Sequence, residues 1–174
     1  MTELTRVRLA GTGGQGVALA GRVLAAAALI SGHHVACSQL FGPESRGGSS
    51  HADVILSPAE VGFPVPEALD VLVALSRQGW SGNLLALAQD ALVIVDERAA
   101  TTNQGDALCF PIAQVAKQVT GNPLIAGVVA LGTLEALTGM VGADPLRQAL
   151  ASMVPGRYHQ ANLRALAAGM ELAL

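Results

Sequence analysis

The feature that most constrains the fold is an alternation of short apolar segments with longer segments rich in alanine and leucine. The short segments have the length and composition of buried strands, and the longer ones repeat apolar residues at helical spacing. Predicted strands cover Val7–Ala10, Val35–Leu40, His51–Leu56, Leu69–Leu75, Ala91–Val95 and Ala107–Phe110. Predicted helices cover Val17–Ile30, Gly82–Gln89, Ile112–Val119, Leu124–Leu137, Pro145–Met153 and Gln160–Leu172. This order predicts a single-domain α/β fold over residues 1–174, Rossmann-like, with a mostly parallel sheet and helices on both faces.

The composition excludes several classes of protein. A net charge of −3 and an aromatic content of 3% are unfavourable for nucleic-acid binding, which needs cations and stacking rings. No uninterrupted apolar run reaches about 18 residues, and residues 1–8 contain no apolar signal segment, so we expect a cytoplasmic protein without a membrane span. Only 13% of the residues are charged, against about a quarter in ordinary domains, which predicts that partners cover much of the surface.

The two cysteines, Cys37 and Cys109, are far apart in the sequence, and no C-x-x-C pair exists. The chain therefore offers neither a zinc site nor the ligand set of an iron–sulfur cluster. We expect two buried free thiols, because an unpaired cysteine behaves as a small hydrophobic residue. No Ser-His-Asp arrangement and no pair of carboxylates stands out, so no catalytic residue is predicted.

The stretch AGTGGQGVALAG joins the first predicted strand to the first predicted helix and matches the pattern G-x-G-x-x-G. Glycine lets a ligand approach the backbone closely, and the first amides of a helix carry the positive end of its dipole, so such a turn suits a phosphate. Three interpretations remain open at this point: a dinucleotide site, another anion site, or a turn whose glycines serve only close packing. The candidate ligand-binding residues are Gly11, Thr12, Gly13, Gly14, Gln15 and Gly16.

A dinucleotide site has a further requirement, an acidic residue about 20 positions later that holds the ribose hydroxyls at the end of the second strand. The predicted second strand reads VACSQL and contains no acid; the first acid beyond it is Glu44, in a different loop. A P-loop would need Lys followed by Ser or Thr after the glycines, and this is also missing. Both observations disfavour NAD, FAD and a P-loop nucleotide.

A second glycine-rich loop lies within FGPESRGGSSHADV, Phe41–Val54, and its candidate ligand-binding residues are Glu44, Arg46, Gly47 and Gly48. Arg46 is the only cation of this loop and could fork onto a phosphate or carboxylate, although taken alone a solvated arginine is the simpler interpretation. The loop follows the second strand, as the glycine turn follows the first. If these strands are parallel neighbours, both loops lie at one edge of the sheet, so we expect them to face one crevice.

Other polar side chains favour structural roles. Asp96 follows a predicted strand, where it either contacts a ligand or caps the next turn. Arg77 is a candidate for the edge of a pocket, and Trp80 is expected to anchor a core or an interface. Solvated, capping or structural roles are expected for His33, His34 and His159, and a surface role is favoured over a ligand contact for His51.

At this point the motifs match a family. In order and spacing the chain resembles the gamma subunit of 2-oxoacid:ferredoxin oxidoreductases, the pyruvate, 2-oxoglutarate, branched-chain ketoacid and indolepyruvate enzymes. The resemblance covers about Val7–Gly169, and the pairing of G-x-G-G-Q-G with G-P-E-x-R-G-G is more specific than either half. The segments that carry it are GTGGQGVALAGRVLAAAA, FGPESRGGSSHADVILS, LDVLVAL, ALVIVD, GNPLIAGVVALGTLEALTG and HQANLRALAAG.

The resemblance implies an accessory subunit of a complex that decarboxylates a 2-oxoacid, passes electrons to ferredoxin and forms acyl-CoA. It implies that thiamine diphosphate and iron–sulfur clusters belong to partner subunits, alpha and beta, with a ferredoxin-like delta subunit as a further candidate. It also associates this chain with coenzyme A, whose phosphates would suit the glycine turn without an acid on the second strand. The alternative hypothesis is a free-standing NAD- or FAD-binding oxidoreductase.

Overall fold

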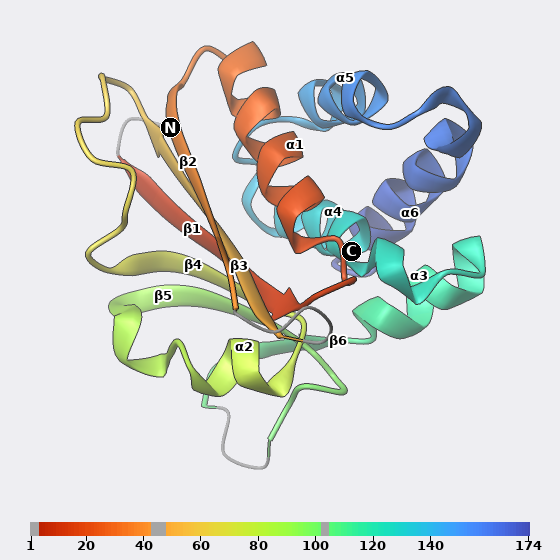
Figure 1. Cartoon of the computed structure of the whole chain (residues 1–174), viewed down its shortest axis with the longest axis horizontal. Helices are drawn as coiled ribbons and strands as arrows, with labels where there is room; N and C mark the ends of the chain where they lie inside the picture. Colours follow the sequence, from red (N-terminus) through yellow and green to blue (C-terminus); the bar gives the residue numbers. More distant parts are fainter. Residues whose placement is uncertain (1–3, 43–47, 102–104) are drawn as a thin grey trace.

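The computed structural model of the chain describes residues 4–42, 48–101 and 105–174 (Figure 1). Its strands are β1 (Thr5–Thr12), β2 (His34–Phe41), β3 (Ser49–Ser57), β4 (Leu69–Ala74), β5 (Leu87–Asp96) and β6 (Leu108–Phe110). Its α-helices are α1 (Val17–Ile30), α2 (Arg77–Ser81), α3 (Ile112–Thr120), α4 (Ala126–Thr138), α5 (Ala143–Met153) and α6 (His159–Glu171). Short 3₁₀ turns are η1 (Leu84–Ala86), η2 (Pro123–Ile125) and η3 (Gly156–Tyr158).

In the described part of the chain, the strands form one six-stranded sheet in the order β2-β3-β1-β4-β5-β6. The pairs β1–β4, β4–β5 and β5–β6 are parallel, whereas β3 runs antiparallel to both β1 and β2. The predicted α/β class and the mostly parallel sheet are confirmed. The expectation that the first two strands are neighbours is wrong, because β2 and β3 form an antiparallel hairpin that places β3 between β1 and β2.

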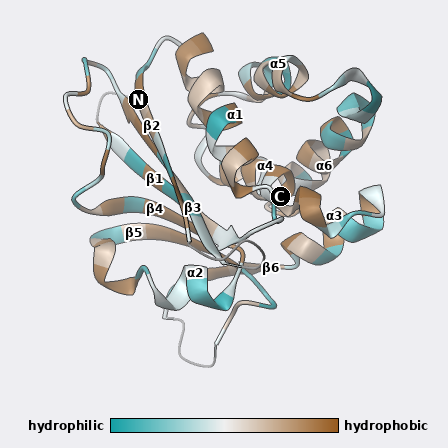
Figure 2. Cartoon of the chain, viewed as in Figure 1, coloured by the Kyte–Doolittle hydropathy of each residue, from teal (hydrophilic) through white to brown (hydrophobic). Residues whose placement is uncertain are grey.

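Helices cover the two faces of the sheet very unequally (Figure 1). On one face, α1 lies against β1, β2 and β3, and α5 packs on α1 while α6 packs on α3 and α4. All five of these helices contribute to the larger hydrophobic core, to which β1 contributes Val7 and Leu9. The other face carries the short helix α2, whose Trp80 packs with Leu72 and Val95 in a smaller cluster. In Figure 2, hydrophobic segments run along α4 and β5, and hydrophilic segments lie on α2. Trp80 is thus a core anchor, as expected.

The predicted helix over Gly82–Gln89 is wrong. The helix of this region lies earlier, because the Ser76 hydroxyl accepts a hydrogen bond from the Gly79 amide at 3.0 Å and starts α2 at Arg77. The helix ends at Ser81, and the Asn83 side chain just beyond it donates to the Gly79 carbonyl oxygen at 2.7 Å. The chain then makes η1 and enters β5 at Leu87. The apolar residues that suggested a helix face water instead, since Leu85 is fully exposed.

The prediction that both cysteine thiols are buried is also wrong. Cys37 is exposed on β2, the edge strand of the sheet, and Cys109 on β6 is only partly buried. Position in the sheet decides this, because an edge strand has a neighbour on one side only. Among the described residues, no helix has the length and apolar character needed to cross a membrane.

Candidate functional site

The glycine turn between β1 and α1 is built from two backbone reversals. Strand β1 continues through Gly11 and Thr12, which pair with Ser50 and Ser49 of β3. The chain then turns through Gly14 at φ +95° and Gly16 at φ +77°, and Gly16 caps the N-terminus of α1. Residues with a Cβ atom rarely adopt this left-handed region, which explains glycine at both positions.

The side chain of Gln15 fills the inside of this turn. Its Oε1 accepts hydrogen bonds from the Thr12 amide at 2.7 Å and the Thr12 hydroxyl at 3.1 Å. Its Nε2 donates to the Leu75 carbonyl oxygen, at the end of β4, at 2.8 Å. A Cβ on Gly11 would lie 2.6 Å from the same Oε1, so Gly11 makes room for the glutamine. Gln15 therefore fixes the shape of the turn and ties it to the neighbouring parallel strand.

The turn also packs against the start of a second helix. The Gly127 amide, in the first turn of α4, donates to the Gln15 carbonyl oxygen at 2.9 Å. A Cβ on Gly16 would lie 2.9 Å from the Leu124 carbonyl oxygen, and one on Gly127 would lie 2.7 Å from the Gly16 carbonyl oxygen. The N-termini of α1 and α4 consequently meet at this turn, and both present the positive ends of their dipoles there.

The backbone of the turn offers hydrogen-bond donors to a ligand. Gly13 and Gly14 are exposed, and the amides of Gly14, Gly16 and Val17 make no hydrogen bond within the described part of the chain. Unsatisfied amides at the start of a helix favour an anion, for which they are oriented without any rearrangement. Close packing thus explains why glycine is needed at positions 11 and 16. The amides of Gly14, Gly16 and Val17 are left without a partner among the described residues and could bind an anion.

The second glycine-rich loop approaches this turn. The Gly13 amide donates to the Gly48 carbonyl oxygen at 3.0 Å, so the structure brings these two predicted residues together. The reason differs from the expected one: β1 and β2 point in the same direction but are separated by β3, and the hairpin carries its loop back to the turn. Glu44, Arg46 and Gly47 lie outside the described residues, so their role stays a prediction.

Other side chains singled out in the sequence have structural partners. Asp96 is buried, and its carboxylate accepts from the Arg98 amide at 3.0 Å and from the Ala113 amide at 2.7 Å. It caps both the turn after β5 and the start of α3, which was one of its two expected roles. Arg77 lies exposed at the first residue of α2.

The histidines also have structural surroundings. The Nδ1 of His33 lies 3.3 Å from the Ala28 carbonyl oxygen at the end of α1, and the Nε2 of His159 is hydrogen-bonded to the Val154 carbonyl oxygen. His34 is exposed at the start of β2. His51, expected at the surface, is instead half-buried beside a charged network.

That network was missed by sequence reasoning. Arg8 forms a bidentate pair with Asp53, with Nε–Oδ1 at 2.6 Å and Nη2–Oδ2 at 2.7 Å, and its Nη1 donates to the Asn83 side chain at 2.9 Å. The His51 Nε2 lies 3.9 Å from Asp53. Burial and the Arg8 guanidinium lower the pKa of His51, and Asp53 opposes them. One sequence signal could have indicated this pair: Arg8 and Asp53 are charged residues of opposite sign, each within a predicted strand that is otherwise mainly apolar, in β1 and β3.

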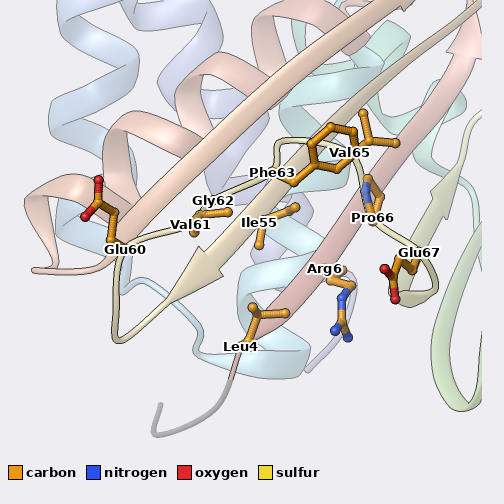
Figure 3. Close-up of a pocket in the computed structure, with 10 residues that line it drawn as sticks. All are labelled: Leu4, Arg6, Ile55, Glu60, Val61, Gly62, Phe63, Val65, Pro66 and Glu67. Atoms are coloured by element: carbon orange, nitrogen blue, oxygen red, sulfur yellow. The ribbon is translucent and has the colours of Figure 1, made fainter.

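Two cavities lie near the sheet face opposite α1. One, of about 280 Å³, is lined by Arg8, His51, Ser49 and Asn83. The other, of about 260 Å³, lies at the opposite end of β1, where the loop after β3 folds over Leu4 and Arg6 (Figure 3). Glu60 and Glu67 are among its lining residues, and the side chains of Phe63 and Val65 lie close together (Figure 3). This second cavity is remote from the glycine turn, which follows the other end of β1.

The topology weighs against a dinucleotide site. In that fold the strand bearing the ribose-binding acid lies next to the first strand. Here β3 occupies that place, so β2 is displaced by one further strand spacing, about 4.8 Å. Moreover, β2 ends at Phe41 without an acidic residue. Among the described residues, no group of three His, Cys, Asp or Glu side chains is arranged to hold a metal ion.

Comparison with known proteins agrees with this geometry. The family model described as pyruvate ferredoxin/flavodoxin oxidoreductase matches residues 6–172. The 2-oxoglutarate synthase subunit KorC of Methanocaldococcus jannaschii is 34% identical over 96% of this chain and 92% of its own length. The gamma subunit of a keto/oxoacid ferredoxin oxidoreductase from Geobacter sulfurreducens superposes with a TM-score of 0.83 at 32% identity, covering 97% of this chain and 98% of that one.

A larger protein contains the same fold. The 2-oxoglutarate:ferredoxin oxidoreductase of Magnetococcus marinus, solved with 2-oxoglutarate, coenzyme A and succinyl-CoA bound, superposes with a TM-score of 0.87 at 22% identity. The match covers 99% of this chain and 31% of that chain. The fold described here therefore also occurs as part of a longer polypeptide.

Proposed function

Because the chain belongs to the pyruvate ferredoxin/flavodoxin oxidoreductase family, we propose that it acts as the gamma subunit of a complex that oxidises a 2-oxoacid to acyl-CoA and contributes its glycine turn to coenzyme A binding. The homologues are subunits of 2-oxoacid oxidoreductases, which are enzymes as assembled complexes. The chain itself supplies no catalytic residue in this proposal. It works in the cytoplasm beside alpha and beta subunits, with a ferredoxin-like delta subunit as a further candidate and ferredoxin as the electron acceptor.

The cofactors belong to other subunits in this proposal. A cluster of the four-iron type needs four thiolates, and this sequence contains two cysteines, on the separate strands β2 and β6. The residues present therefore do not fit an iron–sulfur cluster, and no motif for thiamine diphosphate was found among them. We place both groups on partner subunits, where the oxidative decarboxylation takes place.

Coenzyme A is the ligand that suits the glycine turn best. It carries a diphosphate and a 3′-phosphate, and the turn offers amides from the start of α1 together with the positive ends of two helix dipoles. The observation that carries this proposal is the convergence of α1, α4 and Gly48 on one glycine turn, where the amides of Gly14, Gly16 and Val17 make no hydrogen bond to any described residue. The coenzyme A in the Magnetococcus marinus enzyme supports it. Arg46 remains the sequence-based candidate for an additional cation.

The matched variants Gly14→Asp and Gly14→Asn test this proposal in the assembled complex. Asn and Asp tolerate positive φ better than other residues with a Cβ, and a Cβ here meets only the end of the flexible Leu124 side chain, at 3.3 Å. The two variants have the same size and differ in charge alone. An aspartate at the start of α1 would compete with a phosphate for the amides. We expect Gly14→Asp to raise the KM for coenzyme A about tenfold above Gly14→Asn, about 1.4 kcal/mol.

The KM for the 2-oxoacid should hardly change, because its pocket lies in another subunit; 2-oxoglutarate is the first substrate to assay, given the name of the M. jannaschii relative. Equal KM values for coenzyme A in the two variants would show that the glycine turn does not bind the phosphates of coenzyme A. A flavin spectrum or bound NAD in the purified chain would favour the free-standing oxidoreductase instead.

A further inference from the structure

Strand β2 forms one edge of the sheet and lacks the features that usually keep an edge strand from pairing. It has eight residues and pairs with β3 alone. Its sequence, HVACSQLF, contains no proline, lysine, arginine or acidic residue, and its register with β3 continues without a bulge. The opposite edge strand, β6, has only three residues. Proteins normally protect an exposed edge by shortness, charge, proline or a bulge. Only β2 is therefore suited to pair with a further strand.

The hydrogen-bond pattern shows which backbone groups of β2 are available. The Gly42 amide donates to the Ser49 carbonyl oxygen at 2.7 Å, and these two residues are the next opposite pair after Phe41 and Ser50. In an antiparallel pair, residues that bond the neighbouring strand alternate with residues whose amide and carbonyl point away from it. These outward groups make no hydrogen bond within the described part of the chain. They belong to Val35, Cys37, Gln39 and Phe41.

A second copy of β2 matches this pattern. If two copies pair antiparallel about a two-fold axis at Ser38, Val35 lies opposite Phe41 of the second copy, and Cys37 lies opposite Gln39 of the second copy. All the outward groups then have partners, in about eight hydrogen bonds, because each hydrogen-bonded pair of residues exchanges two. An axis between residues 37 and 38 would instead place outward groups opposite inward ones. The register centred on Ser38 thus uses the whole edge.

The same register covers the exposed apolar side chains of β2. Leu40 and Phe41 are 62% and 63% exposed, although both belong to a strand. Phe41 shares the helical face with Gln39, whose side chain bonds a carbonyl of α1, and it would lie opposite Val35 of the second copy. Leu40, on the other face, would lie opposite Ala36. Cross-strand pairs of aromatic and β-branched side chains stabilise a sheet, and no like charges of β2 oppose each other here.

We propose that two copies of this chain pair through their β2 strands, about a two-fold axis at Ser38, and form one continuous sheet. The contact is isologous, so it uses both β2 edges and stops at two copies. One strand from each copy makes a small interface compared with the ~1,600 Å² of a standard one, so the dimer should dissociate on dilution of the isolated chain. This proposal goes beyond the function proposed above, and it does not depend on the ligand of the glycine turn.

Engineered cysteines test the axis in the full-length chain. In a Cys37→Ser background, Ser38→Cys brings two thiols together at a non-hydrogen-bonded pair, whose Cα atoms lie about 4.5 Å apart, within the range of a disulfide. We expect mild oxidation to convert most of this variant into a covalent dimer on non-reducing gels. Ser152→Cys, at an exposed serine of α5, is the matched control and should stay monomeric. A mixture of Ala36→Cys and Leu40→Cys chains should also cross-link, whereas neither should do so alone.

Sedimentation equilibrium measures the same contact without a cross-link. Leu40→Lys removes an apolar contact and adds a charge to the edge, so we expect the dissociation constant of the dimer to rise about tenfold or more. Leu85→Lys changes a fully exposed leucine of η1 and should leave the dimer unchanged.

A wild-type chain that stays monomeric, together with a Ser38→Cys variant that cross-links no better than Ser152→Cys, would overturn the proposal. A dimer that Leu40→Lys does not weaken would overturn it as well, because the contact would then lie elsewhere. The third contrary result would come from the assembled complex. If Ser38→Cys cross-linked there to a different subunit in place of a second copy, the β2 edge would belong to that subunit.

Discussion

The two faces of β1 differ in chemistry: one is apolar and the other is charged. Val7 and Leu9 point into the larger core and are fully buried among helices. Arg6 and Arg8 alternate with them on the opposite face, where Arg6 pairs with Asp70 of β4 and Arg8 pairs with Asp53 of β3. A single strand thus carries apolar contacts on one side and ion pairs on the other.

The difference separates two contributions to the fold. Burial of aliphatic side chains stabilises the helical face in proportion to the area removed from water. A buried ion pair contributes little net stability, because desolvation of the charges offsets their attraction, but loss of one partner is costly. The helical face therefore contributes most of the free energy of folding. We expect the charged face to determine instead which elements lie beside β1, since Arg8 bonds Asp53 of β3 and Asn83 after α2.

The largest effect is expected from Asp53→Ala, which leaves the Arg8 guanidinium buried without its carboxylate. Loss of one partner of a buried pair costs about 3–5 kcal/mol, and the Arg8 side chain is only 14% exposed. We expect a loss of this size in the free energy of unfolding, measured with urea on the isolated chain if it folds alone, or on the complex otherwise.

The double variant Arg8→Met, Asp53→Leu sharpens the comparison. It replaces both charges with apolar groups of similar size, so we expect it to recover most of the stability that Asp53→Ala loses. Leu9→Ala on the opposite face has no such compensation and should lose about 2–5 kcal/mol. A double variant as unstable as Asp53→Ala would show that the pair itself holds the strands together.

A smaller loss is expected from Gly169→Ala on the helical side. A Cβ at this position would overlap the Val129 carbonyl oxygen of α4, where the backbones of α4 and α6 cross. Overpacking of this kind costs about 1–3 kcal/mol. Gly62→Ala is the matched control, because a Cβ there meets no atom within 4 Å. Thermal melting of the two variants should separate by several degrees, and equal melting temperatures would contradict close packing of these helices.

A modest effect of pH is expected from His51 on the charged face. The pKa of His51 in the folded chain lies below its ordinary value, because burial and Arg8 disfavour the imidazolium. The unfolded chain therefore binds this proton first as the pH falls, so the stability linked to His51 is present above about pH 6.5 and is lost below it. His51→Gln should lose less stability than wild type between about pH 7.5 and about pH 5.5. The exposed His34→Gln is the control for the loss of one imidazole from the sheet.

The smallest effect concerns Cys37, which lies on the helical face of the edge strand opposite Val54. Partial burial and the Asp53 carboxylate raise the pKa of its thiol, whereas Arg22 lowers it. Since only the thiolate is alkylated, iodoacetamide should modify Cys37 more slowly than a cysteine in the unfolded chain. Arg22→Met should slow the reaction further, by a few-fold, as followed by mass spectrometry of the Cys37 peptide. Faster alkylation in Arg22→Met would contradict the assigned charge effect.

Much of the fold could be read from the sequence because its signals are local. The alternation of apolar strands and helices predicted the α/β class, and the glycine pattern located the turn between β1 and α1. Helix α1 has the predicted bounds, Val17–Ile30. The family followed from the spacing of motifs along the chain. Each of these inferences depends on residues close together in sequence, where strand period, helix period and positive φ act directly.

Long-range contacts were decided only by the tertiary structure. Nothing local indicates that β3 inserts between β1 and β2, because strand order depends on which apolar faces pack together. The same applies to the hydrogen bond from Gln15 to Leu75 and to the Arg8–Asp53 pair, whose members lie 60 and 45 residues apart in the sequence. A sequence states the types of side chain; which of them meet depends on folding free energy summed over the whole chain.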